Sequence, residues 1–110
     1  MKKINRVKKY REFKEIMNLR KYVRNEYFTI YYRDKTQEYG RVGLLVTRKN
    51  GNAVARVKIK RQVRSIIDNA IDLKDLNKDL VVGISKNYDK ENFLKSKTLL
   101  ETLLNTIKEK

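Results

Sequence analysis

The sequence predicts a single α+β domain in which a small sheet packs against helices. Its 110 residues suit one domain with a modest core, and hydrophobic residues make up 40% of the chain, which is enough for a globular fold. Helical and strand-like hydrophobic spacings follow one another in the order α, β, β, α, β, α, and one further short strand fits near the start. This order implies a sheet of about four strands covered by three helices.

The first half of the chain supplies one helix and two strands. Residues 1–9 are predicted to form a loose basic arm. In residues 10–17, apolar side chains recur three and four positions apart, as in a short amphipathic helix: Tyr10, Phe13, Ile16 and Met17. Residues 21–25 allow a brief extended segment. Residues 27–33 alternate as a strand does, with Phe28, Ile30 and Tyr32 on one face and Tyr27, Thr29 and Tyr31 on the other. After turn residues at 34–40, residues 41–48 form a second strand whose one side carries Val42, Leu44 and Val46, and we expect the two strands to pair as a hairpin.

The second half supplies a long helix, a buried strand and a closing helix. After the turn at residues 50–52, Asn52 suits the N-cap of a helix. The apolar face of that helix consists of Ile59, Val63, Ile66, Ile67 and Ala70, and the neighbouring stripe consists of Val57, Lys60, Arg61 and Arg64. The short apolar run at 79–85 is predicted as a buried strand. Residues 92–108 close the chain as a helix with one apolar face: Phe93, Leu100, Leu103, Leu104 and Ile107.

Positive charge is concentrated in the first part of the chain. The net charge is +15, and residues 1–64 account for all of it, with 20 Lys and Arg against 5 Asp and Glu; the remaining residues carry 8 of each sign. Residues 48–64 contain seven cations and no acid: Arg48, Lys49, Arg56, Lys58, Lys60, Arg61 and Arg64. A solvated helix face would normally intersperse Glu for ion pairs. The mutual repulsion of these seven cations therefore favours a polyanionic partner, and nucleic acid above all.

Other features of the sequence are less specific. The Gly-led turn at residues 50–53 suits one phosphate, although it is also an ordinary strand-to-helix turn. Phe13 and Tyr31 could stack on unpaired bases or belong to the core and the sheet surface. The chain has no Cys and no His, which excludes Cys/His zinc sites, disulfides and His-based acid–base catalysis. Four acidic residues are predicted to be solvated helix-end and loop positions rather than a metal cluster: Asp68, Asp72, Asp75 and Asp79. No apolar run approaches the roughly 20 residues that a membrane helix needs, so we expect a cytoplasmic protein without a membrane partner.

One long run carries a family resemblance. Residues 41–64 read RVGLLVTRKNGNAVARVKIKRQVR, which resembles the signature of the bacterial ribonuclease P protein subunit. The similarity extends to VKKYREFKEIM, YFTIYYRD, DLVVGISK and the final helix, so it covers nearly the whole chain. The resemblance implies a single domain over residues 1–110, with three helices around a mixed four-stranded sheet and a left-handed βαβ crossover, although right-handed crossovers are the rule.

The same resemblance implies a division of labour and a set of partners. A large RNA subunit with bound Mg²⁺ hydrolyses the phosphodiester that releases the 5′ leader of precursor tRNA. The protein binds the ribonuclease P RNA and that leader, and no small-molecule substrate or protein catalytic residue is expected. The implied RNA-binding positions are Arg48, Lys49, Asn52, Arg56, Lys58, Lys60, Arg61 and Arg64, and the implied leader cleft contains Phe13, Met17 and Tyr31.

The chain departs from the family pattern at three positions. Val57 stands where the motif has Asn, Lys58 replaces a motif Arg, and Met17 stands where many members carry an aromatic residue. Val57 cannot make a side-chain hydrogen bond, so one polar contact must be absent or replaced.

Three alternatives remain open from the residues alone. A small ribosomal-type RNA-binding protein would have a similar composition. A protein that docks in a DNA major groove would use the same stripe, although strands rather than short helices flank it. A protein-only nuclease would need clustered carboxylates to hold a metal.

Overall fold

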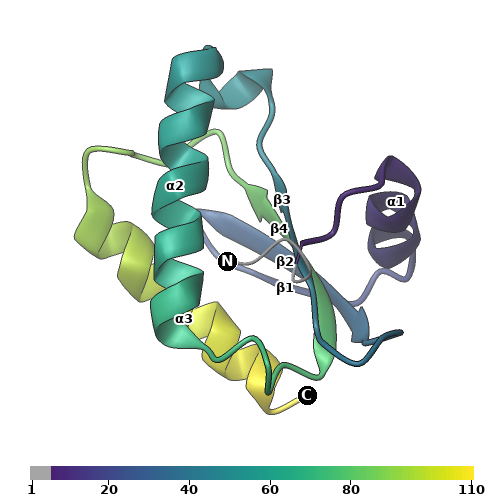
Figure 1. The fold of residues 1–110 in the computed structure, drawn as a ribbon. Coiled ribbons are helices and arrows are strands. Elements are labelled where there is room, and N and C mark those ends of the chain that lie inside the picture. The colour runs from purple at the N-terminus through teal and green to yellow at the C-terminus, as the bar shows by residue number, and fades with distance from the viewer. Residues whose placement is uncertain (1–5) are drawn as a thin grey trace.

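The computed structural model describes residues 6–110 and contains the predicted elements in the predicted order (Figure 1). Three helices, four strands and one 3-10 turn are present in this range: α1 (Tyr10–Asn18), β1 (Tyr22–Arg24), β2 (Phe28–Asp34), β3 (Val42–Leu45), η2 (Arg48–Asn50), α2 (Ala53–Ala70), β4 (Lys78–Ile84) and α3 (Phe93–Lys108). The further short strand that fits near the start of the sequence is therefore present, as β1. The strand predicted over residues 41–48 is shorter in the structure, where it ends at Leu45 and η2 begins at Arg48.

The four strands form one mixed sheet in the order β1-β2-β4-β3. β2 pairs antiparallel with both β1 and β4, and β3 pairs parallel with β4. The expected hairpin between β2 and β3 is therefore wrong. β4 lies between them because Leu80, Val81 and Val82 are apolar and fully buried, which requires a strand covered on both faces. The segment that joins β2 to β3 bonds instead to the loop before β4, through the Lys35 amide to the Asn77 carbonyl at 3.2 Å.

The sheet is the middle of three layers, as Figure 1 shows, with α2 and α3 on one side and α1 on the other. The main core lies under α2 and α3, where their buried Ile, Val and Leu side chains meet Phe28 and Ile30 of β2. The smaller core lies under α1 and is built around Ile16, Val7 and Val81. α1 covers only part of its face, so some of the sheet on that side stays accessible.

The helix α2 begins as the sequence predicts. The Asn52 side-chain oxygen accepts a hydrogen bond from the Ala55 amide at 2.9 Å, which makes Asn52 the N-cap. Gly51 before it has φ 113°, a left-handed conformation that glycine adopts at little cost. The α2 residues Ile59, Val63, Ile66 and Ile67 are buried as expected.

The predicted positions of two tyrosines need correction. Tyr10, expected on the apolar face of α1, is 74% exposed, because α1 reaches the sheet through Ile16 further along. Tyr27, expected beside Tyr31, precedes β2 and is buried against Phe28. Of the predicted basic arm, residues 1–5 lie outside the described residues.

The described end of that arm is not loose. The Val7 amide donates to the Val42 carbonyl at 3.1 Å, and the Val7 side chain is buried in the smaller core. No helix in residues 6–110 is both long and apolar enough to cross a membrane.

Candidate nucleic-acid interface

The first two cations of the basic motif lie on a well-defined turn. Arg48 and Lys49 begin η2 and are exposed. The turn is held by Asn50, whose side-chain oxygen accepts from the Thr47 amide at 3.1 Å and whose side-chain nitrogen donates to the Ser85 carbonyl at 2.8 Å. The backbone is thus fixed by its own hydrogen bonds, and both cationic side chains extend into solvent.

Two other motif residues have contacts within the protein. Asn52 uses its side-chain oxygen as the cap of α2. Lys58 lies 3.4 Å from Glu91, so folding supplies the acidic partner that the motif itself lacks. Both side chains of this pair are largely exposed, and such pairs contribute little to stability. Helical spacing in α2 places Arg56, Lys60 and Arg64 in one row, four residues apart, and Lys58 lies outside this row.

Lys60 and Arg64 border a basic groove between α2, β3 and the N-terminal segment. We use "basic groove" for the depression lined by Arg6, Val7, Lys8, Phe13, Val42, Gly43, Leu44, Lys60 and Arg64. Its lining contains four cations and, among the described residues, no acid. Arg61 and Val57 lie on the exposed surface of α2 next to it.

Arg64 shows how strongly positive the basic groove is. Burial, followed by the nearby positive charge of Arg6, lowers the pKa of Arg64, and Asp68 opposes this only in part. The Nε atoms of Arg64 and Arg56 are buried and have no hydrogen-bond partner in the described part of the chain. Guanidinium groups in such positively charged surroundings suit an anionic partner such as a phosphate.

The predicted cleft residues come together but do not line one depression. Phe13, Met17 and Tyr31 all pack around Ile16 and Val81 in the smaller core. Phe13 and Met17 line a hollow between α1 and β3, which we call the helix hollow, together with Lys8, Tyr10, Lys14, Asn18, Leu44, Leu45 and Val46. Met17 and Tyr31 line a second one on the sheet, which we call the sheet hollow, together with Thr29, Leu45, Thr47, Gly83, Ile84 and Ser85.

The helix hollow and the basic groove adjoin each other. They share Lys8, Phe13 and Leu44, so Phe13 lies at their junction. Its ring can lie directly on β3 because residue 43 is glycine: a Cβ there would lie 2.6 Å from the ring atom Cζ of Phe13. The aromatic ring thus connects the cationic stripe of α2 to the cleft beside α1.

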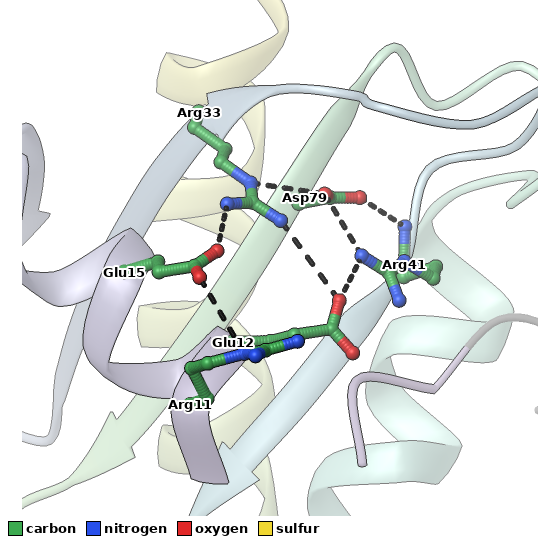
Figure 2. A network of polar contacts seen from close by, with 6 residues as sticks. All are labelled: Arg11, Glu12, Glu15, Arg33, Arg41 and Asp79. Carbon is green, nitrogen blue, oxygen red and sulfur yellow. Dashed lines mark hydrogen bonds and ion pairs between the residues drawn. The ribbon is translucent and has the colours of Figure 1, made fainter. Parts of the chain in front are cut away.

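A network of ion pairs fixes α1 on the sheet (Figure 2). Glu12 of α1 is ion-paired with Arg41, which also contacts Asp79 of β4 at 3.3 Å. Arg33 of β2 lies 3.1 Å from Asp79 and 3.3 Å from Glu15 of α1. The hydrogen bond from Arg41, helped by the charge of Arg33, lowers the pKa of Glu12 against the opposing effect of burial.

Asp79 is the clearest error of the sequence interpretation. It was predicted to be a solvated position, but its side chain is fully buried. It is tolerated there because Arg33 and Arg41 neutralise it and the Arg41 amide donates to it at 3.2 Å. Its place directly before the apolar run of β4 was the one available signal. In residues 6–110, no group of three or more acidic side chains is placed to hold a metal ion.

Comparisons with known proteins identify the family of this arrangement. The family model described as Ribonuclease P matches residues 1–108. The chain is 41% identical to the ribonuclease P protein component of Mycoplasma mycoides subsp. mycoides over 110 residues, which cover 99% of this chain and 98% of that protein. It is 40% identical to the component of Streptococcus agalactiae over 94 residues, 84% of each chain.

Solved structures agree. The fold matches the Staphylococcus aureus RNase P protein with a TM-score of 0.79 and 31% identity, over 94% of this chain and 95% of that one. It matches the Thermotoga maritima RNase P protein with a TM-score of 0.75 and 33% identity, over 90% and 94%. On the evidence of sequence and fold together, the chain belongs to the family of bacterial ribonuclease P protein components.

Proposed function

We propose that this chain binds the ribonuclease P RNA through its basic groove and motif cations, and the 5′ leader of precursor tRNA through the surface around Phe13, Met17 and Tyr31. As a ribonuclease P protein component, it has a role in a ribonuclease complex. The proposed RNA contacts rest above all on one observation: among the described residues, four cations from two distant segments line one groove without an acid. Such a groove is stabilised when phosphates replace its counterions.

The leader surface is supported by its shape and chemistry. Single-stranded RNA exposes base faces that stack on aromatic rings, and it carries phosphates that cations neutralise. The helix hollow offers Phe13 and Met17 with Lys8 and Lys14 at its edge. Met17 in place of an aromatic residue provides a polarisable apolar contact instead of a stacking face.

We also propose that the RNA carries the hydrolytic chemistry and holds the Mg²⁺. The acids that come together around Arg33 and Arg41 in the described part of the chain, Glu12, Glu15 and Asp79, are ion-paired with these two arginines. Within the complex the protein would bind, orient and neutralise. Neutralising the phosphates near the cleavage site would lower the Mg²⁺ concentration that the complex needs.

A two-arm binding experiment tests this proposal. The first arm measures affinity for the RNA subunit against salt concentration: Lys60→Ala with Arg64→Ala should weaken binding and flatten the log–log salt slope by roughly 1 for each cation removed. Replacing Lys97 and Lys108 of α3 by Ala is the charge-matched control, because α3 packs over β1 and β2, away from the groove.

The second arm compares precursor tRNA with leaderless tRNA, each bound to the assembled complex. Phe13→Ala and Tyr31→Ala should weaken binding of the precursor by roughly 1–3 kcal/mol if a base stacks there, and leave the leaderless tRNA unaffected. Equal losses with both substrates would refute the leader surface. An unchanged salt slope in the first arm would refute the groove.

A further inference from the structure

The face of the sheet that α1 partly covers is organised in cross-strand rows. Strand register places residues of all four strands side by side, and alternate residues point to the same face. One row begins under Phe13 and ends at the edge strand: Gly43, Val81, Tyr31 and Tyr22. The next row runs parallel to it, through the sheet hollow: Leu45, Gly83, Thr29 and Arg24.

The first row ends in an exposed aromatic residue. Tyr22 of β1 is 48% exposed, and its ring centroid lies 5.5 Å from that of Tyr31, with the two planes inclined by 50°. The cover that α1 provides is centred on Val81, where Ile16 is fully buried. The aromatic surface therefore continues from Tyr31 beyond the predicted cleft to the edge of the sheet.

The second row has a flat floor and a cationic end. A Cβ added at Gly83 would meet only the Thr29 carbonyl oxygen, at 3.5 Å, so the space above this glycine is open. Arg24 at the end of the row is exposed, and its side chain has no hydrogen bond or ion pair with any residue in 6–110. Residues 20–24 contain three cations and no acid: Arg20, Lys21 and Arg24.

We propose that Tyr22 and Arg24 on the edge strand β1 form a further subsite for single-stranded RNA. The RNA reaches this subsite by passing over Gly83. Tyr22 stacks on one base and Arg24 pairs with an adjacent phosphate. The path from β3 to β1 crosses three strand spacings, roughly 14 Å, so it extends the bound segment beyond the cleft. The proposal rests on the leader binding proposed above and adds where the leader goes next.

The side chains of Tyr22 and Arg24 suit single-stranded RNA better than a role that only protects the edge of the sheet. Charged residues on an edge strand can serve to prevent sheet-to-sheet association. A protective cation does not need an exposed ring beside it, however, or an open glycine floor leading to it. An aromatic ring next to an unpaired guanidinium offers both a stacking face and a phosphate partner, which is the combination that single-strand binding requires.

A series of leader lengths tests the subsite. The assembled complex of RNA subunit and full chain is titrated with precursor tRNAs whose leaders increase one nucleotide at a time. Tyr22→Ala should weaken binding by roughly 5- to 150-fold, but only for leaders long enough to reach β1, while Tyr22→Phe retains the affinity. Arg24→Ala should flatten the salt slope by roughly 1 for the same long leaders, and Arg24→Lys should restore it.

Two further variants make the result specific. Leu94→Ala is the control, because Leu94 is a similarly exposed large side chain on α3, in the layer across the sheet. Gly83→Val fills the floor between the cleft and β1, where a Cβ has room. Gly83→Val should remove the additional affinity that long leaders provide. In the double variant, Tyr22→Ala should then have no further effect on affinity.

The outcomes separate the two proposals. If wild-type affinity does not rise with leader length at all, leader binding fails and the subsite fails with it. If wild-type affinity rises but Tyr22→Ala and Arg24→Ala behave like Leu94→Ala at every length, the subsite is wrong and leader binding stands. A loss that begins only at a threshold length establishes the subsite.

Discussion

Val57 is the residue at which this chain departs most clearly from its family's motif. It is 49% exposed on α2, between the half-buried Arg56 and the exposed Lys58. An apolar side chain in this place offers RNA no hydrogen bond, whereas asparagine offers two donors and an acceptor. The exposure also means that a polar substitution here costs the fold little.

We predict that Val57→Asn strengthens the binding of precursor tRNA, either through contacts to the leader or through contacts linked to Mg²⁺. The reason is the polar contact that the resemblance implies and this chain lacks. Affinity for precursor tRNA at low Mg²⁺ is the measurement, with Val57→Thr as the control for a β-branched side chain that gains only a hydroxyl. Unchanged or weaker affinity of the Asn variant would count against the interpretation.

Glu12 gives a prediction about stability and pH. Its pKa is lowered in the folded protein by the hydrogen bond from Arg41, so the stability it contributes is present above its ordinary value of 4.5 and is lost as the pH falls through the lower folded value. Glu12→Gln should therefore reduce the free energy of unfolding at pH 7 by about 1.5–3 kcal/mol, the usual value for a hydrogen bond to a charged group.

The pH profile makes that prediction specific. Denaturant unfolding at pH 7 and at pH 3 should show the difference between wild type and Glu12→Gln shrinking at the lower pH. The reason is that pH 3 lies below the ordinary value of 4.5, so protonation of Glu12 in the unfolded chain offsets part of the stability that the ion pair provides. Glu15→Gln on the same helix is the matched control, since Glu15 is half exposed and its ion pairs should contribute less than about 1 kcal/mol. A difference that does not vary with pH would show that Glu12 acts through packing rather than charge.

At the scale of the element, α2 depends on its first turn. Asn52 caps the helix, and Asn52→Ala should cost about 0.5–2 kcal/mol of unfolding free energy, whereas Asn52→Asp should keep the cap. The two variants also divide the roles of this motif position. If Asn52 contacts RNA as well, Asn52→Asp should weaken RNA binding while it preserves thermal stability; equal RNA affinity for wild type and the Asp variant would leave the cap as its role.

Local patterns predicted the elements well, because they depend on neighbours in the sequence. The spacing of Ile59, Val63, Ile66 and Ile67 and the turn before Asn52 were enough to define α2. Strand pairing was not predicted, because it depends on residues far apart. The short turn between β2 and β3 suggested a hairpin. In the structure β4 lies between β2 and β3, because its apolar side chains are buried on both faces of the sheet.

The same distinction explains the candidate site. The motif cations could be found because they are close together in the sequence, and Phe13, Met17 and Tyr31 do gather in one cluster. The burial of Asp79 could not be found, because its partners Arg33 and Arg41 lie 46 and 38 residues away. Nor could local spacing show that Arg6 and Lys8 join Lys60 and Arg64 in one groove, since the pairing of the N-terminal segment with β3 brings them together.

At the scale of the whole molecule, the positive charge is concentrated in one part of the chain. All of the net charge of +15 belongs to residues 1–64, which contribute the groove, the motif turn and the edge strand. Residues 65–110 are neutral overall and supply the central strand β4 and the covering helix α3. Cations concentrated in this way attract a polyanion over long distances and orient it on approach.

We propose that this chain enables an RNA to cleave precursor tRNA. The most direct measurement is cleavage of a precursor tRNA by a bacterial ribonuclease P RNA at low Mg²⁺, with and without the protein. We predict strong protein-dependent cleavage at the leader junction, and no cleavage by the protein alone. The absence of stimulation by a folded chain that still binds the RNA would contradict the account and leave only a general RNA-binding role.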